Sequence, residues 1–379
     1  MLKILVLQDR SGCCYWRSNK PLLEMKQQGL ADVTFLELRM SSRKDIALAA
    51  SKADIIQAMG LMGADGLTVV RQYKQLGVKL VIDYDDLHFN VSPFNIAYKH
   101  FGLEDVQIHD PVTNKDTWLW KDGQNGFSIK NNKMKFLGYK AILQEADLVT
   151  CTTLYLKQGL MDISEGQANV AVLPNAIDFT QWKPVDVRDQ FKDTFRFGWA
   201  VSGSHGEDWM FIHDVLLNFL KKHPDAKFVC IGDTYMDVKE GLKEVKDQIE
   251  WYPFSDLWEG HYALRMPLLG LDCAIAPLAD TEFNKCKSPL KWEEYTAFGW
   301  PTICQNMTPY KEHVEHNRTG LLAGTKEEWM TSLERMYSDS KLRQILKFNA
   351  LMEVKETFDI KKIAKEYQEV YENLMSGVH

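Results

Sequence analysis

The chain has 379 residues, which is enough for two domains of ordinary size, and 45% of its residues are hydrophobic. Its 45 basic and 52 acidic residues give a formal net charge of −7. This acidic balance argues against a protein that coats nucleic acid through bulk charge.

Short apolar runs alternate with amphipathic segments over roughly the first 180 residues, and they predict strands and helices respectively. The expected strands are 3–8, 32–38, 54–58, 78–83, 147–151 and 170–173. The expected helices are 20–28, opened by Asn19 and Pro21, then 43–51, 65–76, 133–145 and 154–162. Strands that are nearly continuous apolar runs and are separated by helices are typical of a parallel sheet covered on both faces.

A polar stretch at 99–131, rich in glycine and asparagine, interrupts this rhythm and carries Trp118 and Trp120. A long insertion inside a compact domain is usually functional or mobile. We therefore treat 99–131 as an insertion in the first domain.

The alternating pattern restarts after Pro184. The expected strands are 195–200, 227–231, 271–276, 302–304 and 320–322. The expected helices are 207–222, 238–246, 288–298, 325–337, 340–355 and 360–375. We therefore expect two doubly wound α/β units, whose ligands bind in loops at the carboxyl ends of the strands.

Cysteine usage and hydropathy indicate the compartment. The cysteines, odd in number and without a CxxC pair, are Cys13, Cys14, Cys151, Cys230, Cys273, Cys286 and Cys304. This spacing fits neither a disulfide framework nor a zinc site. Apolar runs stay below the roughly 18 residues of a membrane-spanning helix, and the first residues do not resemble a cleavable signal. We expect a cytoplasmic protein.

A loop at Val201–Asp208 follows an expected strand and opens an expected helix. Its small residues, Gly203 and Ser204, allow backbone N–H groups to approach an anion at the helix N-terminus. The same loop also fits a tight turn with Ser204 or Asp208 as the helix cap. Both interpretations remain open at this point.

The segment 280–301 is more informative. Ser288 and Pro289 predict a helix start. Lys287 lies beside that start, and Lys291 and Glu294 share one face of the helix. Two ammonium groups suit a diphosphate, and a carboxylate suits a pair of hydroxyls such as a ribose diol. A surface helix with an ordinary ion pair is the alternative.

The run Lys287–Ile303 (KSPLKWEEYTAFGWPTI) resembles the donor-binding signature of GT-B glycosyltransferases of the family-4 (glycosyl transferases group 1) type. Glu294 matches the glutamate that binds the donor ribose in that family. Stretches at 146–156, 172–178 and 316–323 also resemble family motifs, in the same order. We assign Ser288 and Leu290, at the start of the same helix, to the donor site as well.

The resemblance implies an α/β protein of the GT-B class, with two doubly wound Rossmann-like domains facing across a cleft. Residues 1–183 would form the acceptor domain and 184–357 the donor domain. The last segment, 358–379, would be a helix that crosses back to the first domain. The resemblance also implies transfer with retention and without a cofactor or metal.

The sequence departs from the family pattern at two places. Cys286 stands where the family often has a first glutamate. Ser202–His205 stand in place of the usual arginine and lysine. The pattern is similar to divergent bacterial and phage members, and we infer that Lys287 and Lys291 supply the positive charge.

Candidates for the acceptor side lie in the first half. Gly12 would let the backbone approach a ligand, and Arg17 would hold a donor phosphate or an acceptor anion, unless this loop only packs its aromatic residues. Strand alternation places Asp83 and Asp85 on one side, where a carboxylate accepts a proton or orients a sugar. The pair also has the chemistry of a cation site, and His88 is an alternative base.

We expect a glycosyltransferase that moves a sugar from a nucleotide-diphosphate sugar to an acceptor hydroxyl, with the nucleobase near Pro253 and Phe254. The acceptor would be a glycan or a lipid-linked sugar. A hydroxymethylated base in DNA is an alternative acceptor, and such a base must first leave the duplex. A non-catalytic nucleotide-sugar-binding module and a sugar-nucleotide epimerase are the competing interpretations.

Overall fold

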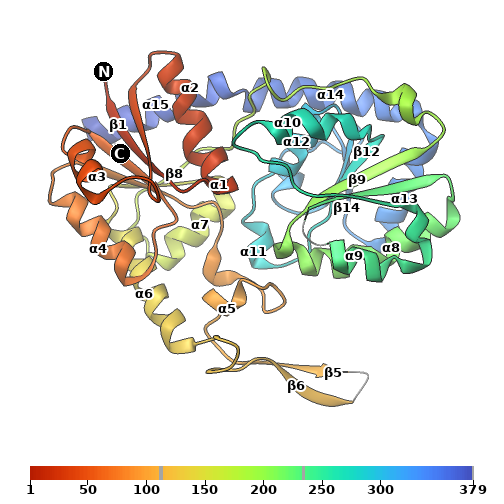
Figure 1. Ribbon diagram of the computed structural model, residues 1–379, viewed down its shortest axis with the longest axis horizontal. Helices are drawn as coiled ribbons and strands as arrows, with labels where there is room; N and C mark the ends of the chain where they lie inside the picture. The colour runs from red at the N-terminus through yellow and green to blue at the C-terminus, as the bar shows by residue number, and fades with distance from the viewer. Residues whose placement is uncertain (111–113, 233–234, 378–379) are drawn as a thin grey trace. The chain divides into compact units, whose positions relative to one another are not determined.

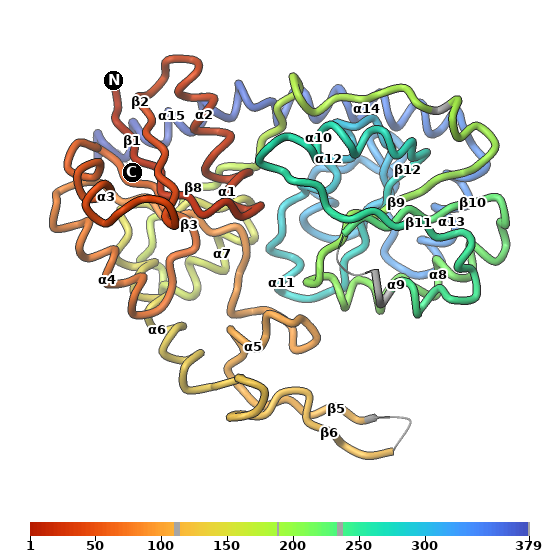
Figure 2. Tube along the Cα trace, viewed as in Figure 1, coloured from red at the N-terminus to blue at the C-terminus, as the bar shows by residue number. Residues whose placement is uncertain are grey.

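The computed structural model describes residues 1–110, 114–232 and 235–377. The chain divides into two compact units (Figures 1 and 2). Unit 1 comprises Met1–Ala176 and Ile360–His379, and unit 2 comprises Ile177–Asp359. Each unit is built around a sheet in which all neighbouring strands are parallel.

The sheet of unit 1 has the strand order β2-β1-β3-β4-β7-β8. Its strands are β1 (Lys3–Gln8), β2 (Asp32–Glu37), β3 (Ile55–Met59), β4 (Lys79–Asp83), β7 (Leu148–Cys151) and β8 (Val170–Val172). Its helices are α1 (Gly12–Cys14), α2 (Lys20–Gln27), α3 (Arg43–Ala50), α4 (Gly63–Lys74), α5 (Tyr98–Phe101), α6 (Ile129–Glu145), α7 (Leu154–Ile163) and α15 (Ile360–Ser376). Side chains of both faces of β1 are buried, as a sheet covered by helices on both faces requires.

The last helix belongs to unit 1 although it follows unit 2 in the sequence. Helix α15 packs along α2, and Ile363, Tyr367 and Tyr371 join the same hydrophobic cluster as Ile4 of β1. The core of unit 1 therefore includes residues from both ends of the chain.

The insertion at 99–131 forms a hairpin that extends from unit 1 (Figure 1). Strand β5 (Val106–Asp110) pairs in antiparallel register with β6 (Lys115–Trp120). Aromatic rings of Tyr98, Trp120 and Phe127 lie 5.7 to 5.9 Å apart at its base. Residues 111–113 of the insertion lie outside the described part of the chain.

The sheet of unit 2 has the order β11-β10-β9-β12-β13-β14. Its strands are β9 (Phe195–Val201), β10 (Ala226–Gly232), β11 (Ile249–Tyr252), β12 (Cys273–Ala276), β13 (Thr302–Gln305) and β14 (Leu321–Ala323). Its helices are α8 (Gly206–Lys222), α9 (Tyr235–Gly241), α10 (His261–Arg265), α11 (Glu282–Lys285), α12 (Leu290–Ala297), α13 (Lys326–Ser338) and α14 (Ser340–Phe358). Helix α8 packs against α13, and α12 packs against α14.

Local predictions are wrong at three places. The expected loop at 9–19 is helical from Gly12, with a π-helix at Tyr15–Asn19 that leads into α2. The expected helix 238–246 ends at Gly241 and is followed by a 3-10 segment, Lys243–Gln248. Strand β11 was not predicted, because it is an edge strand whose side chains are at least partly exposed and which therefore lacks an apolar run.

Candidate functional site

The strand order of unit 2 marks one position in its sheet. The chain leaves β9 toward β10 and β11 on one side, and it later resumes on the other side at β12. In open parallel sheets, ligands bind outside the carboxyl ends of the strands at such a reversal. The loops that follow β9 and β12 are therefore the first place to look for a site.

A buried carboxylate joins these two loops. The Asp208 side chain is 1% exposed. Its Oδ1 accepts hydrogen bonds from the Ala279 backbone N–H (2.6 Å) and from Asn284 Nδ2 (2.9 Å). Its Oδ2 lies 2.6 Å from His205 Nδ1. The loop after β9 is thus fixed to the loop after β12. Sequence reasoning considered Asp208 only as a helix cap and missed this role.

The cap predictions for both helices are wrong. His205 is the N-cap of α8 and makes no side-chain cap hydrogen bond, so neither Ser204 nor Asp208 caps this helix. Pro289, rather than Ser288, is the N-cap of α12, and it also lacks a side-chain cap bond. The N-cap residues of both helices therefore supply no side-chain cap, and helix N-termini of this kind attract anions.

Lys287 and Lys291 lie close to the loop after β9. Burial lowers the pKa of His205, Asp208 opposes this shift, and the positive charges of Lys287 and Lys291 lower the pKa further. The Lys287 ammonium lies 4.5 Å from the centre of the Phe283 ring. Two positive charges therefore gather beside the uncapped helix starts.

The predicted pair Lys291 and Glu294 forms at a distance of 3.2 Å between Nζ and Oε2. The alternative of a surface helix is wrong, because every residue of α12 from Trp292 to Ala297 is buried. Burial raises the pKa of Glu294, and Lys291 opposes the shift. Leu290 and Ser288 are partly exposed at the start of this helix.

Gly203 and Phe254 occupy the same edge of the sheet. Gly203 belongs to a 3-10 turn, and a Cβ atom at this position would meet no heavy atom within 4 Å. Phe254, with Pro253 before it, follows β11. A Cβ atom at Gly232, the last residue of β10, would lie 1.9 Å from the Val201 carbonyl oxygen and 2.6 Å from the Phe254 ring. The Phe254 ring therefore packs across the ends of β9 and β10.

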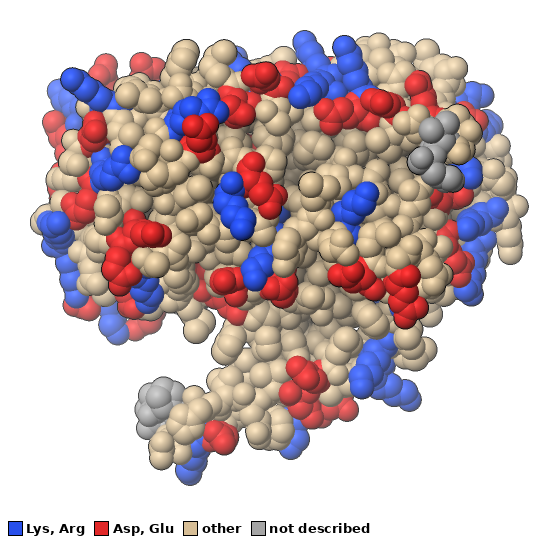
Figure 3. All heavy atoms as spheres, turned by 180° about the vertical axis from the view of Figure 1, so that it is seen from behind, with Lys and Arg blue, Asp and Glu red and all other residues tan. Residues whose placement is uncertain are grey.

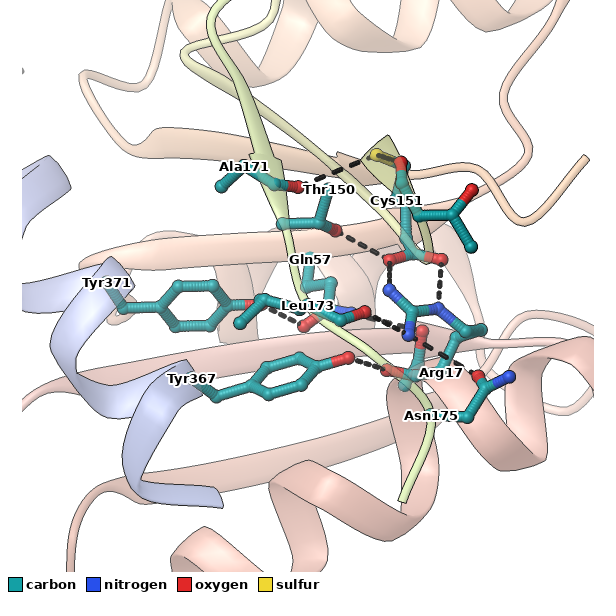
Figure 4. Close-up of polar contacts among 12 residues, drawn as sticks. Arg17, Gln57, Thr150, Cys151, Ala171, Leu173, Asn175, Tyr367 and Tyr371 are labelled. Atoms are coloured by element: carbon teal, nitrogen blue, oxygen red, sulfur yellow. Dashed lines mark hydrogen bonds and ion pairs between the residues drawn. The ribbon is translucent and has the colours of Figure 1, made fainter. Parts of the chain in front are cut away.

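The structure contradicts the predictions for Arg17 and Asp83, which form a buried ion pair (Figure 4). Arg17 is 1% exposed and Asp83 is 0% exposed. Arg17 Nε and Nη2 donate to the two Asp83 oxygens at 3.1 and 2.8 Å. Asp83 Oδ2 also accepts from Thr150 Oγ1 (2.6 Å), and Arg17 Nη1 donates to the Leu173 carbonyl (2.6 Å). Neither group faces a ligand.

The alternation prediction for Asp83 and Asp85 fails because β4 ends at Asp83. Asp83 points into the core of unit 1, where the Arg17 guanidinium balances its charge. Sequence reasoning missed Thr150 and Leu173 as partners, since they are distant along the chain and carry no local signal.

The remaining acceptor candidates gather at the carboxyl ends of β1 and β4. Asp85 is only partly buried, and a hydrogen bond links it to Cys13, the neighbour of the exposed Gly12. Burial raises the pKa of Asp85, the Asp86 charge raises it further, and His88 opposes the shift. Among the described residues, His88 Nδ1 is buried without a hydrogen-bond partner.

The described residues also bear on whether the chain has a metal site or a membrane-spanning helix. Within residues 1–110, 114–232 and 235–377, no group of three or more His, Cys, Asp or Glu side chains could hold a metal ion. Over the same ranges, the helices are too short or too polar to cross a membrane.

Comparisons with known proteins identify the fold. No family model matches the chain. Over 270 residues it is 23% identical to the putative glycosyltransferase YtcC of Bacillus subtilis, and the match spans 65% of this chain and 65% of that protein.

Solved structures match over nearly the whole chain. Sucrose-phosphate synthase from Thermosynechococcus elongatus matches with a TM-score of 0.68 and 13% identity over 100% of both chains. Anabaena HepE in complex with UDP and glucose matches with a TM-score of 0.66 and 14% identity, over 98% of this chain and 100% of that one. The pneumococcal O-GlcNAc transferase GtfA, with UDP and GlcNAc, matches with a TM-score of 0.57 and 13% identity, over 89% of this chain and 61% of that one. These matches confirm the predicted GT-B fold.

Proposed function

We propose that this GT-B protein is a glycosyltransferase that moves a sugar from a nucleoside-diphosphate sugar to an acceptor hydroxyl. The observation that carries the proposal is the gathering of Lys287, Lys291 and Glu294 around the loop after β9 and the start of α12 in unit 2. The match to YtcC and the nucleotides bound in the HepE and GtfA structures support it. Uridine diphosphate is the nucleotide to test first, since both structures hold it.

The roles follow from charge. The diphosphate would lie on the Ser202–His205 loop and the start of α12, where Lys287 and Lys291 stabilise the negative charge that develops as the glycosidic bond breaks. Glu294 would accept hydrogen bonds from the ribose hydroxyls. The lysines supply the positive charge that a metal ion supplies in other transferases, so we propose that no metal is required.

On the acceptor side we propose Asp85 as the proton acceptor, with Gly12 and His88 beside the acceptor. The predicted roles of Asp83 and Arg17 are withdrawn, because the two side chains form an ion pair with each other in the core. We assign the chain to the family-4 type with retention, on the motif at Lys287–Ile303. A glycan or lipid-linked sugar is the proposed acceptor class.

Charge on the surface speaks against DNA as the acceptor. On the face shown in Figure 3, lysine and arginine side chains are interspersed with aspartate and glutamate. Binding to the phosphates of a duplex needs a gathered basic surface. Strong loss of transfer with rising salt would reverse this preference.

One observation favours a non-catalytic module as the second candidate. At the place of the family's first glutamate, Cys286 is buried and fully enclosed, so this position offers no carboxylate to a donor sugar.

Hydrolysis and transfer from radiolabelled UDP-sugars separate the two candidates. We expect slow release of sugar by the wild type, which acceptor accelerates, and at least about a tenfold loss in Lys287→Ala, the size of one charge-assisted contact. Lys221→Ala, on an exposed ion pair with Glu244, is the matched control. Nucleotide binding without any release of sugar would favour the module.

A further inference from the structure

The side chain of Tyr262, on α10, is 5% exposed. Its hydroxyl is buried, and within the described part of the chain it has no hydrogen-bond partner. An unsatisfied buried hydroxyl destabilises a fold, and most such groups in proteins are paired. A group of this kind therefore calls for a partner that arrives from outside the chain.

The ring of Tyr262 lies between two elements of the proposed donor site. Its centre is 6.4 Å from that of Phe254, in the loop after β11, and 6.3 Å from that of Phe298. Phe298 is one helical turn beyond Glu294, since its N–H donates to the Glu294 carbonyl at 3.1 Å. Tyr262 thus connects the loop assigned to the nucleobase with the helix assigned to the ribose.

The charge of Glu294 acts on this hydroxyl. Burial raises the pKa of Tyr262 well above its usual value, and the Glu294 carboxylate raises it further. The phenol therefore stays protonated at any physiological pH and can serve as a hydrogen-bond donor.

Phenol and carboxylate together complement a vicinal diol. One hydroxyl of a diol can donate to Glu294, whose Oε2 already accepts from Lys291, while the oxygen of the other hydroxyl accepts from Tyr262. The carboxylate can only accept hydrogen bonds when it is ionised, so Tyr262 adds the donor that Glu294 lacks.

We propose that Tyr262 is a specificity-determining residue of the donor site, whose hydroxyl donates to a ribosyl oxygen of the nucleotide that Glu294 binds. The proposal rests on the proposed function of unit 2. It gives a role to a hydroxyl that lies in an aromatic cluster formed with Trp182 and Phe298.

Tyr262→Phe gives a test with two readouts. We expect the melting temperature of the free protein to stay the same or to rise, because the variant removes an unsatisfied buried group. We expect the affinity for UDP, measured by calorimetry, to fall about 3- to 10-fold, the range of one neutral hydrogen bond. If the hydroxyl had only a structural role, the variant would melt at a lower temperature and would bind UDP with unchanged affinity.

Deoxynucleotides locate the contact. The wild type should bind 2′-deoxy-UDP or 3′-deoxy-UDP more weakly than UDP, and Tyr262→Phe should lose the preference against one of the two analogues. Tyr337→Phe, whose hydroxyl binds Asp225 at the surface of the same unit, is the matched control and should bind all three nucleotides like the wild type.

The outcomes distinguish the two proposals. If the wild type binds UDP and Tyr262→Phe binds UDP and both analogues identically, the role of Tyr262 is overturned and the donor site stands. If Tyr262→Phe melts at a lower temperature and binds UDP normally, the hydroxyl serves the fold alone, which also overturns the role. If the wild type binds no nucleoside diphosphate, both proposals fail together.

Discussion

Asp85 is the residue that we propose as the proton acceptor of unit 1. It is partly buried and hydrogen-bonded to Cys13, and it lies just after β4 with a raised pKa that the charge of His88 opposes. A general base is most effective when its pKa lies near the working pH. This property distinguishes Asp85 from the saturated carboxylate of Asp83.

Asp85→Asn should lower the rate of transfer by about 10²- to 10⁴-fold, the range for loss of a general base, and should leave UDP binding unchanged. In the wild type, transfer at saturating donor should fall as the pH is lowered through the raised pKa of Asp85, because a protonated carboxyl cannot accept a proton. A transfer rate that is independent of pH on the acid side, or an active Asp85→Asn variant, would exclude Asp85 as the base.

Some of the candidate site could be predicted at this scale and some could not. Lys291 and Glu294 are three residues apart, so helix periodicity alone brings them together. Arg17 and Asp83 are 66 positions apart, and Tyr262 carries no sequence motif. Their contacts are set by tertiary packing, which a single sequence does not encode in a local pattern.

At the scale of elements, the buried network around Arg17 joins five segments of unit 1. Arg17 lies in the π-helix Tyr15–Asn19, and through its side chain it reaches β4, the segment after β8 and, via Asp83, β7. Helix α15 adds Tyr367, whose hydroxyl donates to the Arg17 carbonyl at 3.0 Å (Figure 4). This network connects α15, near the end of the chain, with the π-helix Tyr15–Asn19, near its start.

Arg17→Met should lower the free energy of unfolding of unit 1 by about 3–5 kcal/mol, because it leaves Asp83 charged and unpaired in the core. Replacing Asp83 by Asn in the same chain should restore part of the loss. Lys140→Ala, on an exposed pair with Glu165, is the matched control and should change the denaturation midpoint little. Equal midpoints for wild type and Arg17→Met would refute a stabilising role.

Elements differ in how well the sequence predicts them. Strands such as β1 and β9 are buried on both faces, so each consists mainly of apolar residues that hydropathy reveals. The hairpin β5–β6 and the edge strand β11 carry exposed side chains and mixed polarity, so the same signal is missing. Helix starts were misassigned because Ser288 and Ser204 have the residue types of caps, whereas the N-cap positions are occupied by Pro289 and His205.

At the scale of the whole molecule, two α/β units, each built on a parallel sheet, carry different parts of the proposed reaction. Unit 2 holds the positive charges, Glu294 and Tyr262, and unit 1 holds Asp85. From this division we expect that a variant in unit 1 can stop transfer without affecting nucleotide binding. It also means that the donor site can be tested before any acceptor is known.

The most direct test of the central claim is a calorimetric titration of the wild type with UDP, with EDTA and separately with Mg²⁺. We expect one UDP to bind per chain in both conditions, to raise the melting temperature, and to bind at least about tenfold more weakly to Glu294→Gln and Lys291→Ala. Absence of binding in both conditions, repeated with GDP, ADP and CMP, would contradict the account.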